Sequence, residues 1–237
     1  MMRTFELISR EPRIGVVLYR DHGDQYVTKT IPLMADSRAL AKALQNETHR
    51  GGGDVPEAVY EALLEAIRHQ QWSPSPTAKK VVVVMGDAPP QQATLDKIQQ
   101  LVSEAAGQGF LLYAIKVRTS KYVERVMDLP NYDPELTTFD RMAQWGNGRS
   151  VWVEFWTQSA VGRWKGTAQP PGPEFAQRVV FREVLKAVLE EGYRDRIDPF
   201  IGVLLQYVEE PIREDRVPFD KATPGRPGRP SDPQMTR

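Results

Sequence analysis

The sequence predicts an α/β fold, in which a doubly wound, mostly parallel β-sheet carries helices on both faces. Two observations lead to this prediction. Apolar runs of strand length, such as residues 81–85, alternate along the chain with amphipathic helical segments, such as residues 94–108. The later runs are apolar without interruption, which is typical of strands that a parallel sheet buries on both faces.

The first elements are expected to be a hairpin and a short helix. Residues 14–20 are apolar between charged neighbours, and residues 26–33 alternate between apolar and polar side chains. These two runs are therefore predicted to pair as a β-hairpin, with a turn at residues 22–24. Residues 37–45 follow as a short amphipathic helix.

The clearest helical pattern begins near residue 54. Its apolar residues fall at helical spacing from Val55 to Ile67, and its glutamates point away from that stripe. Asp54 is expected to be the N-cap, Pro56 to lie in the first turn, and Glu57 to complete a capping box.

The rest of the chain continues the alternation and then departs from it. Strands are predicted at 79–87, 109–117 and 150–154, and helices at 94–108 and 136–145. Residues 1–156 are therefore expected to form the domain. Residues 157–210 are expected to be a helical extension that packs back on it, with helices at 175–192 and 199–208. Residues 211–237 are rich in proline and charge, so a disordered tail is expected there.

Composition excludes several classes of function. The chain has 237 residues, of which 41% are hydrophobic, and its 31 basic and 31 acidic side chains give no net charge. Nucleic-acid binding therefore has no support from the charge balance, and no apolar run is long enough to span a membrane. The chain has no cysteine and no recognisable nucleophile–base motif, so we expect no enzymatic activity.

Carboxylates recur where the predicted strands end. Asp21 and Asp24 follow the first strand, Asp87 follows the strand at 79–87, and Asp54 and Glu57 precede the long helix. Ligands of doubly wound sheets bind beyond the carboxyl ends of the strands. Oxygen-rich clusters of this kind suit the hard cations Mg²⁺, Mn²⁺ and Ca²⁺.

Four segments together resemble the von Willebrand factor type A family over about residues 10–155. They read, in chain order, RIGVVLYRD, GGGDVPEAVYEAL, KKVVVVMGDAPP and FDRMAQWGNGRSVWV. The resemblance implies a metal ion-dependent adhesion site. Asp87 matches the aspartate of the third loop, with Gly86 where a threonine is common. Residues 54–57 are similar to the Asp-x-Pro-Glu of integrin β-subunit type A domains, which implies that Glu57 ligates the central metal and Asp54 an adjacent cation.

The sequence departs from the family in its first strand. That strand is central in the family's sheet and carries an Asp-x-Ser-x-Ser motif, but no such motif occurs here and no strand precedes Ile14. Residues 1–10 look like the end of the helix that follows the strand. The sequence is then a fragment, the product of a start codon placed too late, or a decayed copy.

The resemblance implies a non-catalytic, adhesion-type binding module that recruits a protein partner through the metal edge. A partner's carboxylate would complete the coordination of a weakly held divalent cation. One alternative is a nucleotide- or phosphate-handling α/β enzyme that uses the glycine loop and Asp87, although no phosphate-binding Lys-Ser/Thr follows the glycines. The other alternative is a non-functional remnant.

Each candidate residue also has a simpler interpretation. Asp54 and Glu57 fit a helix-capping box that needs no metal. Asp87 fits a residue that only ends a strand. Asp21 and Asp24 fit a turn, since aspartate stabilises turns through its own side chain.

Overall fold

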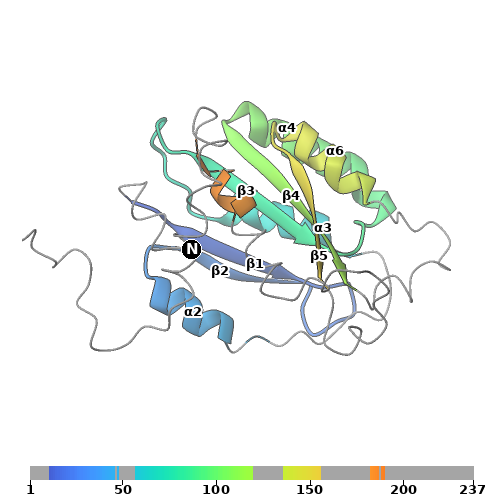
Figure 1. The fold of residues 1–237 in the computed structure, drawn as a ribbon, viewed down its shortest axis with the longest axis horizontal. Helices are drawn as coiled ribbons and strands as arrows, with labels where there is room; N and C mark the ends of the chain where they lie inside the picture. The colour runs from blue at the N-terminus through green and yellow to red at the C-terminus, as the bar shows by residue number, and fades with distance from the viewer. Residues whose placement is uncertain are drawn as a thin grey trace, which may run out of the picture.

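The strands of the protein form two sheets in a computed structural model, which describes residues 11–45, 47, 57–119, 136–155, 182–186 and 188–189 (Figure 1). The first sheet is an antiparallel hairpin of β1 (Ile14–Tyr19) and β2 (Thr28–Met34). The second sheet is parallel, with the order β3 (Lys80–Gly86), β4 (Phe110–Thr119), β5 (Ser150–Phe155). The predicted α/β fold with a parallel sheet is confirmed.

Three helices cover one face of the parallel sheet. They are α3 (Val59–Leu64), which continues as a π-helical turn at Glu65–His69, α4 (Leu95–Gly107) and α6 (Thr137–Trp145). Figure 1 shows α4 and α6 side by side along β4 and β5. The shared core consists of fully buried side chains from helices and strands, among them Val59, Leu63, Ile98, Val102, Leu112, Phe139 and Met142. Burial of these large apolar groups is the main stabilising contribution.

The opposite face of the parallel sheet is also covered. Ile115 and Val153 are buried there, and Val184 from the helical residues 182–186 packs against them. The neighbouring Leu185 is fully buried. Helical segments thus cover both faces, as a doubly wound sheet requires. Among the described residues, no helix is both long and apolar enough to cross a lipid bilayer.

The side chain of Gln70 holds the hairpin where its ladder is irregular. The register of β1 against β2 shifts between Ile14 and Val16. There, the Gln70 amide donates to the carbonyl oxygen of Ile31 at 3.2 Å and accepts from the backbone N–H of Leu33 at 2.9 Å. The side-chain amide thus replaces a peptide group of the neighbouring strand.

We expect Gln70→Ala to lower the free energy of unfolding by about 1–3 kcal/mol, because two partly buried backbone groups lose their partners. Gln71→Ala, an exposed neighbour, is the control. Urea unfolding followed by circular dichroism measures both variants. Equal stability of the two variants would show that water replaces the amide without cost.

The sequence predicted the hairpin at one edge of a mostly parallel sheet that lacks the first strand of the resembled family. Within the described residues, β1 pairs with β2 alone, and no backbone ladder connects β1 to β3. Helix α2 (Ser37–Gln45) lies on the far side of the hairpin and forms as predicted (Figure 1). The predictions for residues 1–10, 199–208 and 211–237 lie outside the part of the chain that the structure describes.

The start of the long helix was predicted wrongly. The helix begins at Val59 rather than near residue 54, and its N-cap, Ala58, makes no side-chain capping bond. Glu57 lies before the helix, where it forms an isolated parallel bridge with Pro90. A tertiary backbone contact therefore holds Glu57 out of the helix, and the capping-box interpretation of this residue fails.

Candidate functional site

Three segments meet at the carboxyl ends of β1 and β3. They are the turn after β1, the residues before α3, and the loop after β3. The backbone N–H of Glu57 donates to the carbonyl oxygen of Pro89 at 2.9 Å. The side-chain amide of Gln91 donates to the carboxylate of Asp21 at 3.1 Å. We refer to Tyr19, Asp21, Glu57 and Asp87 together as the carboxylate rim.

Tyr19 is the last residue of β1 at this rim. Its hydroxyl donates to the carbonyl oxygen of Met85 at 2.7 Å. Burial raises the pKa of the Tyr19 phenol, and the negative charges of Glu57 and Asp87 raise it further. Both carboxylates therefore lie close enough to act on one phenol, since such interactions fall off with distance. Glu57 and Asp87 thus lie on segments that meet at this rim, while Asp54, the third predicted metal ligand, lies outside the described residues.

Asp87 is exposed to solvent, yet the pKa of its carboxyl group is raised. The residue is exposed to solvent by area. Nevertheless, protein atoms packed around its carboxyl group displace water and raise its pKa, and a hydrogen bond with its own backbone N–H opposes that effect. Burial disfavours the charged carboxylate, so a positive charge placed beside Asp87 would be stabilising.

Asp21 and Asp24 make the contacts of a turn. Asp21 is buried with 5% of its surface exposed, and its carbonyl oxygen accepts from the backbone N–H of Asp24 at 3.3 Å. Through Gln91, Asp21 also connects the hairpin to the loop after β3. These contacts fit a positioning role, and ligand binding by either residue remains a prediction.

A complete metal centre is not formed by the described residues. Within them, no group of three or more His, Cys, Asp or Glu side chains is arranged to hold a metal ion. Glu57 and Asp87 could contribute two carboxylates from different loops. Carboxylate oxygens are the ligands that Mg²⁺, Mn²⁺ and Ca²⁺ prefer, so the donor chemistry fits these cations and leaves coordination positions open.

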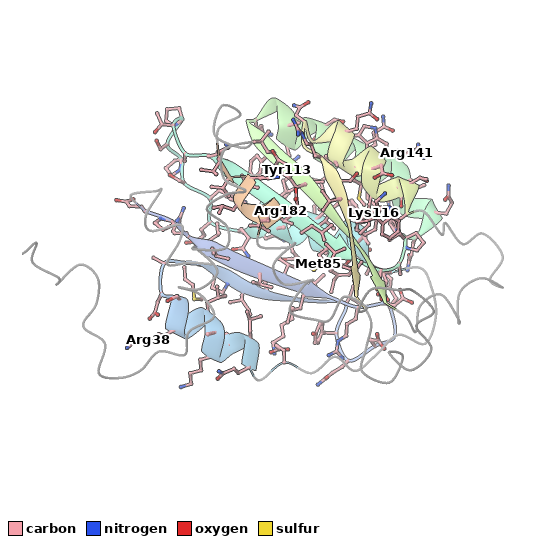
Figure 2. The ribbon with its side chains drawn as sticks, viewed as in Figure 1. Arg38, Met85, Tyr113, Lys116, Arg141 and Arg182 are labelled. Atoms are coloured by element: carbon pink, nitrogen blue, oxygen red, sulfur yellow. The ribbon has the colours of Figure 1, made fainter. Side chains whose placement is uncertain are left out.

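Sequence reasoning missed a charged group in the core. Lys116, on β4, has 6% of its surface exposed, and its ammonium lies 2.8 Å from a carboxylate oxygen of Asp140 on α6. The ammonium also lies 4.6 Å from the centre of the Trp152 ring, and the Ser150 hydroxyl donates to Asp140. A lysine inside an otherwise apolar run was the available signal. Because Asp140 and Trp152 compensate its charge, Lys116 joins β4, β5 and α6 (Figure 2).

Glycine at position 86 follows from the position of Tyr19. A Cβ atom built on Gly86 would overlap the Tyr19 hydroxyl and lie 3.0 Å from Cζ of Phe139. A threonine, common at this point in the resembled family, could not fit unless both rings moved. The departure from the family pattern at Gly86 therefore has a local steric reason.

Comparisons with known proteins add a distant structural similarity. No family model matches the chain, and no curated protein matches it. Among solved structures, the chain is similar to the crystal structure of the conserved hypothetical protein BatB from Bacteroides thetaiotaomicron. The identity is 16%, the TM-score is 0.49, and the match covers 78% of this chain and 86% of that chain. A likeness of this size carries no conclusion about function.

Proposed function

We propose that this protein is a binding module of the von Willebrand factor type A kind, which recruits a protein partner through a divalent cation at the carboxylate rim. The observation that supports the proposal most is the hydrogen bond from the Glu57 N–H to the Pro89 carbonyl oxygen, which holds the Glu57 segment against the loop that carries Asp87. These carboxylates come from loops 30 residues apart in the sequence. They gather at the carboxyl ends of the strands, where doubly wound folds bind ligands.

Two carboxylates bind a cation weakly and leave coordination positions open, which allows the cation to bind a partner protein. Mg²⁺ and Mn²⁺ take six oxygen ligands, so most positions around the ion would be left to water. A carboxylate from a partner protein can replace one of these waters and gain the attraction of an incompletely neutralised ion. Glu57 and Asp87 would be the ligands, and Tyr19 would position the two loops around them.

The test is a calorimetric titration of the full chain with Mn²⁺ and Mg²⁺. We expect a dissociation constant in the submillimolar range or weaker, because few protein ligands are present. Glu57→Gln keeps the shape of the side chain and should weaken binding by about tenfold, which corresponds to ~1.4 kcal/mol. Asp96→Asn, which alters an exposed carboxylate on α4, is the matched control and should bind as the wild type does.

Two results would contradict the proposal. Binding that Glu57→Gln and Asp96→Asn weaken equally would indicate nonspecific attraction of cations to surface carboxylates. Micromolar binding that Glu57→Gln leaves unchanged would place the ligands elsewhere in the chain.

A further inference from the structure

Asp21 is a buried carboxylate in the turn that joins β1 to β2. Only 5% of its surface is exposed, and one of its carboxylate oxygens accepts from the side-chain amide of Gln91 at 3.1 Å. An ionised carboxylate has no proton to donate, so the amide has to present its N–H to Asp21 in this contact. A buried carboxylate is destabilising unless a donor compensates it, and Gln91 supplies such a donor from 70 residues further along the chain.

The backbone of Gln91 is held in place independently of its contact with Asp21. Gln91 precedes the 3-10 turn Gln92–Thr94, which leads directly into α4. Its carbonyl oxygen accepts from the backbone N–H of Thr94 at 2.9 Å and from the hydroxyl of the same residue at 2.7 Å. Helix α4 is in turn anchored in the core by the fully buried Ile98. The Gln91 side chain therefore extends from a rigid base, which reduces the entropy that its contact with Asp21 costs.

The loop after β3 is held at two points. Its middle is buried, whereas Asp87 at its start is exposed. The carbonyl oxygen of Pro89 accepts from the backbone N–H of Glu57. Two residues later, the Gln91 side chain donates to Asp21. The conformation of the loop, and with it the position of the Asp87 carboxylate, depends on both contacts.

A second contact ties the same turn to α3. The Nε2 atom of His22 lies 3.3 Å from a carboxylate oxygen of Glu61, and this contact is an ion pair only when the imidazole is protonated. Half of the His22 side chain is exposed, so solvent weakens the attraction. The contact between Asp21 and Gln91 is partly buried and does not depend on a proton, so of the two it holds the turn more firmly.

Asp21 does not converge with the other carboxylates of the rim on one point. Among the residues that the structure describes, no three acidic or histidine side chains are arranged to hold a metal ion, which applies to Asp21, Glu57 and Asp87 as a set. One oxygen of Asp21 is also engaged by Gln91. These contacts suit an anchor that accepts a hydrogen bond, whereas Glu57 and Asp87 remain the candidate ligands.

We propose that Gln91 is a positioning residue of the carboxylate rim, with Asp21 as its anchor rather than as a ligand of the cation. We refer to the Gln91 amide and the Asp21 carboxylate as the rim clasp. The rim clasp fixes the turn after β1 against the loop that carries Asp87, and it thereby raises the affinity of the rim for a divalent cation. The effect on affinity rests on the proposed function. Because coupling between two sites is reciprocal, a bound cation in turn holds the rim clasp closed.

Two variants with the net charge of the wild type test the proposal. Gln91→Met removes the amide, keeps the length of the side chain and leaves Asp21 without this donor. The double variant Asp21→Asn with Gln91→Glu restores a carboxylate–amide pair of the same length, with donor and acceptor exchanged. If Asp21 is only an anchor, the first variant opens the rim clasp and the second one keeps it closed.

Calorimetric titration with Mn²⁺ measures the effect on the cation. Gln91→Met should bind Mn²⁺ about fivefold more weakly than the wild type, while the double variant should stay within about twofold of it. Gln70→Ala, which removes the contacts at the other end of the hairpin, is the matched control. It should lower stability and leave the affinity for Mn²⁺ unchanged.

The Tyr19 ring provides a readout that needs no cation. Tyr19 ends β1 two residues before Asp21, and its hydroxyl donates to the carbonyl oxygen of Met85. In protein labelled with ¹³C-tyrosine, the Tyr19 signal is assigned with Tyr19→Phe. The signal should shift in Gln91→Met, return towards its wild-type position in the double variant, and stay in place in Gln70→Ala.

Three outcomes separate the possibilities. An unchanged Tyr19 signal in Gln91→Met would overturn the proposal, because the amide would then not position the turn. Loss of Mn²⁺ binding in the double variant, with binding retained in Gln91→Met, would also overturn it and make Asp21 a ligand. If the wild type binds no Mn²⁺ while the Tyr19 signal responds as expected, the proposed function fails together with the effect on affinity, and the positioning of the turn by the rim clasp is supported.

Discussion

Gly86→Ala is expected to lower the free energy of unfolding by about 1–3 kcal/mol, the usual cost of adding a methyl group to a filled space. The new methyl group would overlap the Tyr19 hydroxyl and crowd the Phe139 ring. Moving Tyr19 would also break its hydrogen bond to the carbonyl oxygen of Met85. The effect is large for one methyl group because the obstacles come from two different elements.

A double-mutant cycle separates the two obstacles. Tyr19→Phe alone should cost about 0.5–1.5 kcal/mol, because the Met85 carbonyl loses its donor. In the double variant, the two losses should sum to less than their separate values, since Tyr19→Phe removes the atom that the methyl group meets first. Urea unfolding of the four proteins gives the cycle. Strict additivity would mean that Phe139 or the backbone, rather than Tyr19, limits the space at Gly86.

Asp87→Asn is expected to have opposite effects with and without a divalent cation. The carboxyl group of Asp87 has a raised pKa because of burial. A carboxyl group with a higher pKa in the folded state binds more protons there than in the unfolded state. Stability therefore falls as the pH rises from the unfolded pKa through the folded pKa. Without a cation, Asp87→Asn should remove this loss and leave the protein as stable or slightly more stable.

With an excess of Mg²⁺, the same variant should be less stable than the wild type. Wild-type protein gains stability from bound cation, and a loss of about tenfold in affinity removes up to ~1.4 kcal/mol of that gain. Thermal melts of the wild type and Asp87→Asn in EDTA and in Mg²⁺ give the comparison. In EDTA, the difference in stability between the two proteins should disappear below about pH 4, where the carboxyl group of Asp87 is protonated in the folded and unfolded states. An equal loss of stability in both conditions would identify Asp87 as a structural residue.

The sequence predicted the parallel strands well because their pattern is local. β3 and β5 lie within a residue or two of the expected spans, since uninterrupted apolar runs have few alternatives once helices separate them. Helices α4 and α6 also begin and end close to the predicted residues. The contact of the Glu57 segment with the loop after β3, seen in the hydrogen bond from Glu57 to Pro89, followed from the rule that ligand-binding loops gather at the carboxyl ends of the strands.

The errors concern contacts between distant residues. The start of the long helix depends on the hydrogen bond from Glu57 to Pro89, which no local pattern reveals. The need for glycine at position 86 depends on Tyr19, which lies 67 residues earlier in the chain. Lys116 carried a local signal, but its partner on α6 had to be seen in three dimensions.

Paramagnetic broadening by Mn²⁺ tests most directly whether the carboxylate rim binds a cation. In protein labelled with ¹³C-tyrosine, Tyr19→Phe assigns the Tyr19 ring signal among the eight tyrosines. We expect substoichiometric Mn²⁺ to broaden the Tyr19 signal first, because the negative charges of Glu57 and Asp87 act on its phenol. The Tyr113 signal should change later, and Asp87→Asn should abolish the selectivity. Broadening of Tyr19 and Tyr113 at the same Mn²⁺ concentration, or unchanged selectivity in Asp87→Asn, would contradict the account.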